Sequence, residues 1–380
     1  MGKKLELSKR WLVTGMVCVL ILGAESSGWG TVHVNAASDR TTVSSLQEIQ
    51  QRFAEGLAAR KLMIALKYKG TTLNLEHLLK KALNNALDGD PYTKYVVDRY
   101  VYSWRGTTGS AKITLRVDYR ESAEQSAYVR SKAMTILKRI IKPDMSGHEK
   151  IKAIHDYIVT NLRYDTDYRN YTAYEGLRTG EAVCQGYTLL TYQLLKGAGL
   201  ENLIVEGKAG GQLHAWNLVR IDGLWYHLDT TWDDPQPNYS GGIKYTYYLR
   251  SDTQMRKDHI WQESRYPKAA VPYLTTLQAL VDQGGVKSVV FQSLKMQLGY
   301  QLYDVGSAVT DSKGLTESVK GALQEDKAMI TLRYAGTERK LLRDLSSLYD
   351  LGIQNVRYTL EPLEGTRDLK VQIFWDSKKQ

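Results

Sequence analysis

Two stretches of this 380-residue chain follow the same order of patterns. RKLMIALKYKG at 60–70 and DKAMITLRYAG at 326–336 both alternate polar and apolar residues, as a strand with one buried face does. In each stretch a polar helical pattern precedes this strand, a leucine-rich helix follows it, and two more alternating segments come last. The repeated order predicts an α+β protein with two small αβαββ modules, at 38–120 and 314–380. The alternative is a chance similarity between two ordinary α+β segments.

The segment between these modules begins with two helix-start signals. Ser122 with Gln125 and Ser146 with Glu149 have the spacing of capping boxes, in which each residue satisfies a free backbone amide of the other. The second helix then presents one apolar face, formed by Ile151, Ile154, Ile158 and Leu162. We therefore expect a central domain at 121–265, followed by a linker region at 266–313.

The first 37 residues have the layout of a signal peptide. Four cations precede an apolar stretch at 11–24: Lys3, Lys4, Lys9 and Arg10. VNAA at 34–37 predicts cleavage near Ala36 or Ala37. The apolar stretch is shorter than the roughly 20 residues that span a bilayer, so a permanent anchor is the weaker alternative. We therefore expect a secreted or cell-wall-associated protein with no stable membrane span after cleavage.

Cleavage would also change the charge and the cysteine count of the chain. The net charge falls from +10 to +8 when the leader's four cations and two acids leave. The remaining charges form no long basic run, which argues against nucleic acid and favours anionic cell-wall polymers as partners. Cys18 leaves with the leader, so Cys184 is the one cysteine of the mature chain and no internal disulfide can form. One cysteine and seven scattered histidines give no zinc pattern.

Cys184 lies where the segment at 179–199 changes from a loop to a helix. Apolar residues mark the buried side of this helix, and Gly197 and Gly199 mark its end. The free amides and the dipole of a first helical turn favour the negative thiolate. The alternative is that Cys184 is only a small buried apolar residue.

HAWNLVRIDGLWYHLDTTWDDP at 214–235 predicts a β-hairpin, because Asp222 and Gly223 form a two-residue turn signal. Pairing outward from this turn places five residues on one face, namely His214, Trp216, His227, Asp229 and Thr231. His214 and Asp229 are then diagonal neighbours within hydrogen-bonding reach. A cysteine nucleophile needs a base and a group that orients the base, which His214 and Asp229 would supply. His227 competes for the role of base, and a polar pair without chemistry is the other interpretation.

Three further polar residues have simpler interpretations. His155 borders the apolar face of its helix and is expected to be a packing residue. Asp233 and Asp234 are more plausible as the start of a turn before Pro235 than as a cation site. No cofactor and no metal ion is predicted.

The motifs EAVCQGY, HAWNLV and WYHLDTTWDDP resemble those of the transglutaminase-like superfamily. The resemblance covers about 120 residues, reaching back to HDYIVTNLRYD at 155–165. It implies a papain-like core with Cys184 as nucleophile, His214 as general base and then acid, and Asp229 as the residue that orients His214. The calcium-binding and β-sandwich regions of animal transglutaminases have no counterpart, so no calcium requirement is implied.

These features together predict an exported cysteine-dependent acyl-transfer enzyme that acts on protein or peptide amides. By family analogy, hydrolysis is favoured over cross-linking. The alternative is a catalytically idle, cell-wall-associated binding or scaffold protein. A structural cysteine that forms an intermolecular disulfide is a third interpretation.

Overall fold

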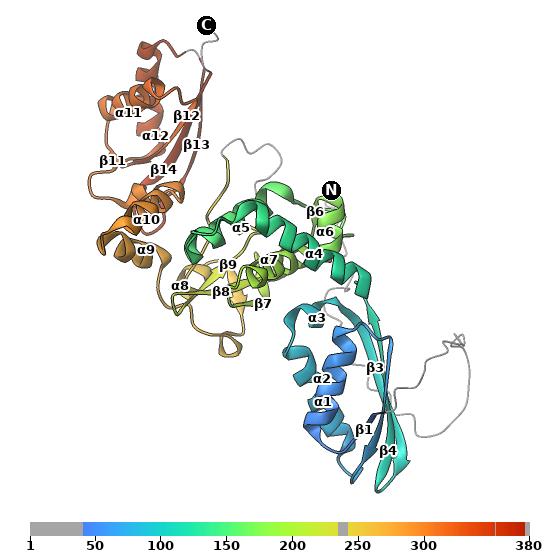
Figure 1. Ribbon diagram of the computed structural model, residues 1–380. Coiled ribbons are helices and arrows are strands. Elements are labelled where there is room, and N and C mark those ends of the chain that lie inside the picture. Colours follow the sequence, from blue (N-terminus) through green and yellow to red (C-terminus); the bar gives the residue numbers. More distant parts are fainter. Residues whose placement is uncertain (1–40, 235–241, 354, 377–380) are drawn as a thin grey trace. The chain divides into compact units, whose positions relative to one another are not determined.

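The computed structural model describes residues 41–234, 242–353 and 355–376 (Figure 1). Helices and strands are mixed along this part of the chain, so the predicted α+β class is confirmed. The chain forms two compact units, one with the described residues up to Val271 apart from Gly242, the other from Pro272 onward. The predicted signal peptide at 1–37 lies outside the described residues. Within the described ranges, no helix combines the length and apolar character needed to cross a bilayer.

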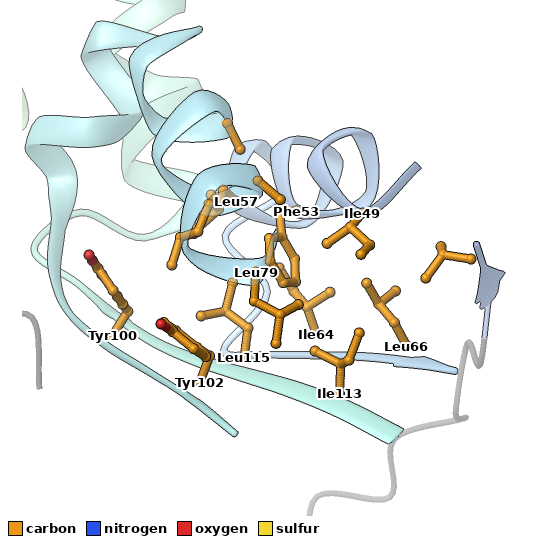
Figure 2. Packing of buried hydrophobic residues seen from close by; sticks show 14 of the residues in the cluster. Ile49, Phe53, Leu57, Ile64, Leu66, Leu79, Tyr100, Tyr102, Ile113 and Leu115 are labelled. Atoms are coloured by element: carbon orange, nitrogen blue, oxygen red, sulfur yellow. The ribbon is translucent and has the colours of Figure 1, made fainter. Parts of the chain in front are cut away.

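The N-terminal part of the first unit is a four-stranded sheet covered by helices on one face (Figure 1). Its elements are β1 (Thr41–Val43), α1 (Leu46–Ala58), β2 (Met63–Lys69), α2 (Leu75–Asp88), α3 (Pro91–Val96), β3 (Val97–Thr107) and β4 (Ser110–Tyr119). The strand order is β1-β2-β4-β3, with β1 parallel to β2 and the other neighbours antiparallel. Ile49 and Phe53 of α1 and Leu79 of α2 pack on Ile113 and Leu115 of β4 (Figure 2).

The second unit repeats this arrangement. Its elements are α9 (Tyr273–Asp282), α10 (Val286–Gln297), η2 (Tyr300–Tyr303), β11 (Ala308–Val309), α11 (Ser312–Gln324), β12 (Met329–Tyr334), α12 (Glu338–Leu345), η3 (Ser346–Leu351), β13 (Val356–Pro362) and β14 (Leu369–Trp375). The strand order β11-β12-β14-β13 has the same parallel and antiparallel neighbours as the first sheet. Each module has the predicted αβαββ order preceded by one short strand, and each has one further short helix before its last two strands, α3 in the first module and η3 in the second. The segment at 266–313, expected as a linker, contains α9 and α10; the domain boundaries themselves remain a prediction.

The central part of the first unit packs helices against a second sheet. Its elements are α4 (Ala123–Ile140), α5 (Gly147–Asn161), β5 (Arg163–Tyr164), α6 (Ala173–Thr179), β6 (Glu181–Ala182), α7 (Cys184–Gly197), β7 (Asn202–Ala209), β8 (Gln212–Ile221), β9 (Leu224–Leu228), α8 (Asp252–Met255), β10 (His259–Trp261) and η1 (Glu263–Arg265). The sheet has the order β10-β7-β8-β9. Both predicted capping boxes are present, at the starts of α4 and α5. Thr188 of α7 donates to the carbonyl oxygen of Ala215, which fixes this helix on β8.

The hairpin of β8 and β9 has the predicted register near its turn. Asp222 and Gly223 have φ values of 48° and 82°, and Leu218 pairs with His227. The prediction is wrong farther from the turn, because β9 ends at Leu228 and Thr231 belongs to the turn that follows. Asp229 causes this ending, since its Oδ1 accepts hydrogen bonds from the backbone amides of Thr231 and Trp232 and so bends the chain.

Candidate active site

Cys184 is the first residue of helix α7 and its side chain is buried. The residue before it, Val183, occupies the N-cap and offers no side-chain acceptor. The three helices that precede α7 along the chain, α4, α5 and α6, all begin with capping boxes that use such an acceptor. The first amides of α7 therefore have no capping side chain, and their partial positive charge lies beside the sulfur.

His214 of β8 lies between this cysteine and Asp229. Its Nε2 is 2.6 Å from Asp229 Oδ2, which leaves Nδ1 as the nitrogen for another partner. Cys184 is among the groups that raise the pKa of this imidazole, so the thiol lies close to the ring. His214 and Asp229 are 8% and 1% exposed. The structure therefore brings together the three residues that the sequence singled out, in the order sulfur, imidazole, carboxylate.

The opposite charges of His214 and Asp229 stabilise each other. Burial opposes a charged imidazole, but the Asp229 carboxylate and then Cys184 outweigh it and raise the pKa of His214 to about 10. Burial also opposes the charge of Asp229, yet the charge and hydrogen bond of His214 lower the pKa of this carboxyl well below its usual range. An imidazolium beside a carboxylate is the protonation state of His214 and Asp229 that fits both shifts.

A second histidine, His259 of β10, also binds Asp229 and was missed by the sequence analysis. Its Nε2 is 3.1 Å from Asp229 Oδ2, and its Nδ1 is 2.6 Å from Asp258 Oδ1. Tyr247 donates to the other oxygen of Asp258. Asp229 thus accepts four hydrogen bonds, two from backbone amides and two from histidines, and its position is fixed from every side.

His227, the competing candidate for the base, has a hydrogen-bond partner at each of its two ring nitrogens. The Trp216 indole can only donate, so it fixes His227 Nδ1 as an acceptor, at 2.8 Å. His227 Nε2 then donates to Asp252, at 2.9 Å. Burial lowers the pKa of His227 against the raising effect of Asp252. Both nitrogens of His227 are therefore occupied in a neutral imidazole, so His214 is the stronger candidate for the base.

The aspartates of the DDP motif serve buried partners. Asp233 is fully buried and its Oδ2 is 3.1 Å from His155 Nε2, so His155 is a buried packing residue with a polar partner. Asp234 accepts from the Tyr187 hydroxyl and the Tyr164 amide, both at the same oxygen. These bonds connect α5 and α7 to the residues that follow Asp229.

One group of side chains in the described residues has the composition of a metal site. Ligand atoms of His214, Asp229 and His259 lie within 4.8 Å of one another. The hydrogen bonds already described account for this proximity, because both imidazoles donate to Asp229. A metal ion would have to displace both of these protons.

A helix-borne thiol, a sheet-borne imidazole and its carboxylate are the groups that a papain-like cysteine nucleophile would require. Residues 134–230, which include all three residues, match the family model described as the transglutaminase-like superfamily. The match covers 97 of the 380 residues of the chain. His259 lies outside the matched residues.

Among curated proteins, the chain is similar to the kyphoscoliosis peptidases of mouse and human. The mouse protein is 24% identical over an alignment of 282 residues that covers 60% of this chain and 43% of the relative. The human protein is 24% identical over an alignment of 249 residues that covers 53% of this chain and 37% of the relative. This chain thus spans about two fifths of the relatives' length. A solved structure described as a TGase is 15% identical, covers 60% of this chain and 70% of its own, and has a TM-score of 0.26, too low to support an argument.

Proposed function

We propose that this chain is a cysteine-dependent acyl-transfer enzyme that acts on protein or peptide amides. The observation that carries the proposal is the position of His214, whose Nε2 is 2.6 Å from Asp229 Oδ2 and whose pKa is raised by both Asp229 and the nearby Cys184. In the proposed mechanism, His214 takes the proton of the thiol and later delivers it to the departing amine. A hydrogen-bonded pair of His214 and Asp229 that had no catalytic role would not require a thiol beside it.

In the proposed reaction, Cys184 Sγ attacks the amide carbonyl carbon and a tetrahedral oxyanion forms. The first amides of α7, which lack a capping side chain, are placed to stabilise the oxyanion. His214 gives its Nδ1 proton to the departing amine as the C–N bond breaks, which leaves a thioester on Cys184. His214 then takes a proton from the acceptor, and the C–S bond breaks as the acceptor adds.

We propose water as the preferred acceptor, so that the outcome is proteolysis or deamidation and not cross-linking. The similarity to proteins named as peptidases supports this choice. The basic chain and its signal-like leader support action outside the cell, at a cell wall. As part of the same proposal, the protein is bacterial and is exported.

Mass spectrometry of peptide and glutamine-donor mixtures tests the reaction. Hydrolysis adds about 18 Da across the fragments, deamidation adds about 1 Da, and cross-linking loses about 17 Da, as acyl-transfer stoichiometry requires. We expect the wild type to give the first or second product and Cys184→Ala to give none. A mass loss would replace hydrolysis by cross-linking while leaving the nucleophile in place.

A matched pair of histidine variants tests the base. His214→Gln and His227→Gln make the same change on the same sheet, and both sites are buried. We expect His214→Gln to abolish turnover and the rapid alkylation of Cys184 near neutral pH, and His227→Gln to retain both in its folded fraction. Alkylation of wild-type Cys184 no faster than in the unfolded chain would favour the idle scaffold protein.

A further inference from the structure

The sheet of the N-terminal module has one open face. Helices α1 and α2 cover the other face, where Tyr100 and Tyr102 point toward them (Figure 2). The open face of β2, β3 and β4 carries six cations: Lys67, Lys69, Arg99, Arg105, Lys112 and Arg116. The carboxylates of these strands are Asp98 and Asp118, which form ion pairs with Arg99 and Arg120 near the α3 end of the sheet.

Three of these cations form one row across the sheet. Lys67 pairs with Lys112, and Lys112 pairs with Arg105, so the three side chains stand side by side on the open face. Like charges directly opposite one another on neighbouring strands are destabilising. Within the described residues, none of the three forms an ion pair with a carboxylate. The row therefore costs stability in the folded chain unless an anion lies against it.

The C-terminal module shows what the same row looks like when it is neutralised. The equivalent register places Arg333, Lys370 and Glu361 side by side. Lys370 binds Glu361 at 2.8 Å, and Arg333 binds Asp368 at 2.5 Å. Two modules with one topology therefore differ at this row, since one is internally paired and the other is left cationic.

The surroundings of the cationic row indicate what kind of anion fits. Lys67, Arg105 and Lys112 line a shallow pocket of about 290 Å³, together with Thr107 and Ser110. The row spans two inter-strand spacings, about 10 Å, and so faces more than one anionic group. The aromatic residues of β2, β3 and β4 lie on the helix-covered side or beside it, so the open face has no ring on which a nucleic-acid base could stack.

We propose that the open face of the N-terminal module, centred on Lys67, Lys112 and Arg105, binds a linear phosphate-bearing polymer without bases, such as a polyol phosphate. Arg105 supplies the planar fork that matches phosphate oxygens, and the two lysines supply point charges. The site is independent of Cys184 and does not require that the chain be catalytic. This face carries part of the excess positive charge of the sequence.

Binding of the full-length chain to a polyglycerol phosphate of defined length, measured by calorimetry over a series of salt concentrations, tests this proposal. We expect the double variant Lys67→Gln/Lys112→Gln to bind about tenfold to thirtyfold more weakly at low salt. Its plot of log affinity against log salt should be shallower by about one to two. The control Lys80→Gln/Lys81→Gln removes the same charge from exposed positions on α2 and should change neither quantity.

Other outcomes overturn the proposal in distinguishable ways. Equal weakening by both double variants would mean that net charge, and not the row, drives binding. Binding of anionic lipid vesicles that exceeds polymer binding, with the same dependence on Lys67 and Lys112, would make the face a membrane-docking surface. Stronger binding of a single-stranded oligonucleotide would replace the polymer by nucleic acid.

Discussion

Asp229→Asn is the substitution that most directly tests the candidate site, because Asp229 acts only as an acceptor. Its Oδ1 accepts from the amides of Thr231 and Trp232, and its Oδ2 from His214 and His259. Asparagine has one accepting oxygen and one donating NH₂ group. Whichever way the amide turns, its NH₂ group faces two donors. The substitution keeps the shape of the side chain and removes half of its hydrogen bonds.

The chemical consequence of the substitution depends on which of its two orientations the side-chain amide adopts. If the amide oxygen stays on the two rigid backbone amides, the NH₂ group faces His214 Nε2, which must then accept. The imidazole proton moves to Nδ1, where it blocks transfer from Cys184. A change of the same kind in a serine-protease triad lowers kcat by about 10⁴. The pKa of His214, raised from 6.5 to about 10, corresponds to about 5 kcal/mol in favour of the imidazolium, and Asp229 supplies the largest favourable part.

The assay compares kcat, KM and the rate of Cys184 alkylation for the wild type and the variant across pH. We expect kcat to fall by about 10³ to 10⁴ with KM little changed, and the rapid alkylation near neutral pH to be lost. A raised histidine pKa stabilises the fold fully below pH 6.5, and this contribution disappears as pH rises toward 10. The stability difference between the two proteins should therefore be largest between about pH 4 and 6.5. A variant that keeps more than a tenth of wild-type kcat would refute the reasoning.

Three further predictions follow from single contacts. Asp234→Asn keeps an acceptor for Tyr187 and Tyr164 and removes a carboxyl group whose pKa is raised to about 6 by burial. Urea unfolding should show the variant more stable than the wild type by about 1 to 3 kcal/mol at pH 8 and equally stable at pH 3.5. His259→Gln removes one support of Asp229 and should lower kcat by about tenfold to a hundredfold with KM unchanged, whereas unchanged kcat would make His259 a packing residue. Gly186→Ala places a methyl group 2.7 Å from the Cβ of Ala182 and should destabilise α7, while the helical control Gly321→Ala, with nothing within 4 Å, should stabilise its unit by up to about 1 kcal/mol in thermal unfolding.

The part of the site that local sequence predicts is the part set by local geometry. Asp222 and Gly223 fix the hairpin register, and the register brings His214 and Asp229 to one end of the hairpin. His259 follows a different rule, because it reaches Asp229 through the pairing of β10 with β7, where it lies opposite Ala209. A three-residue strand gives no usable alternation. The neighbouring Asp258, which binds His259 directly, was the one signal that could have singled it out.

The same distinction explains the outcome for the fold. The strands and leucine-rich helices of both modules are long enough to show their periodicity, so their order was predictable. β1 and β11, with three and two residues, are too short to be detected in this way. Helices α9 and α10 were overlooked within an expected linker, although both are ordinary amphipathic helices with buried residues such as Leu277 and Phe291.

The two modules also separate what a fold requires from what a surface can vary. Leu66 and Leu332 occupy equivalent inward positions, and each is buried in the hydrophobic core of its module. Lys67 and Arg333, one residue later, point outward, where the fold tolerates either a paired or an unpaired cation. The cationic module contacts helix α7, since the Gln185 side chain donates to the Tyr95 carbonyl of α3 at 3.0 Å. A polymer held on this module would therefore be held by the same compact unit that carries Cys184, one residue before Gln185.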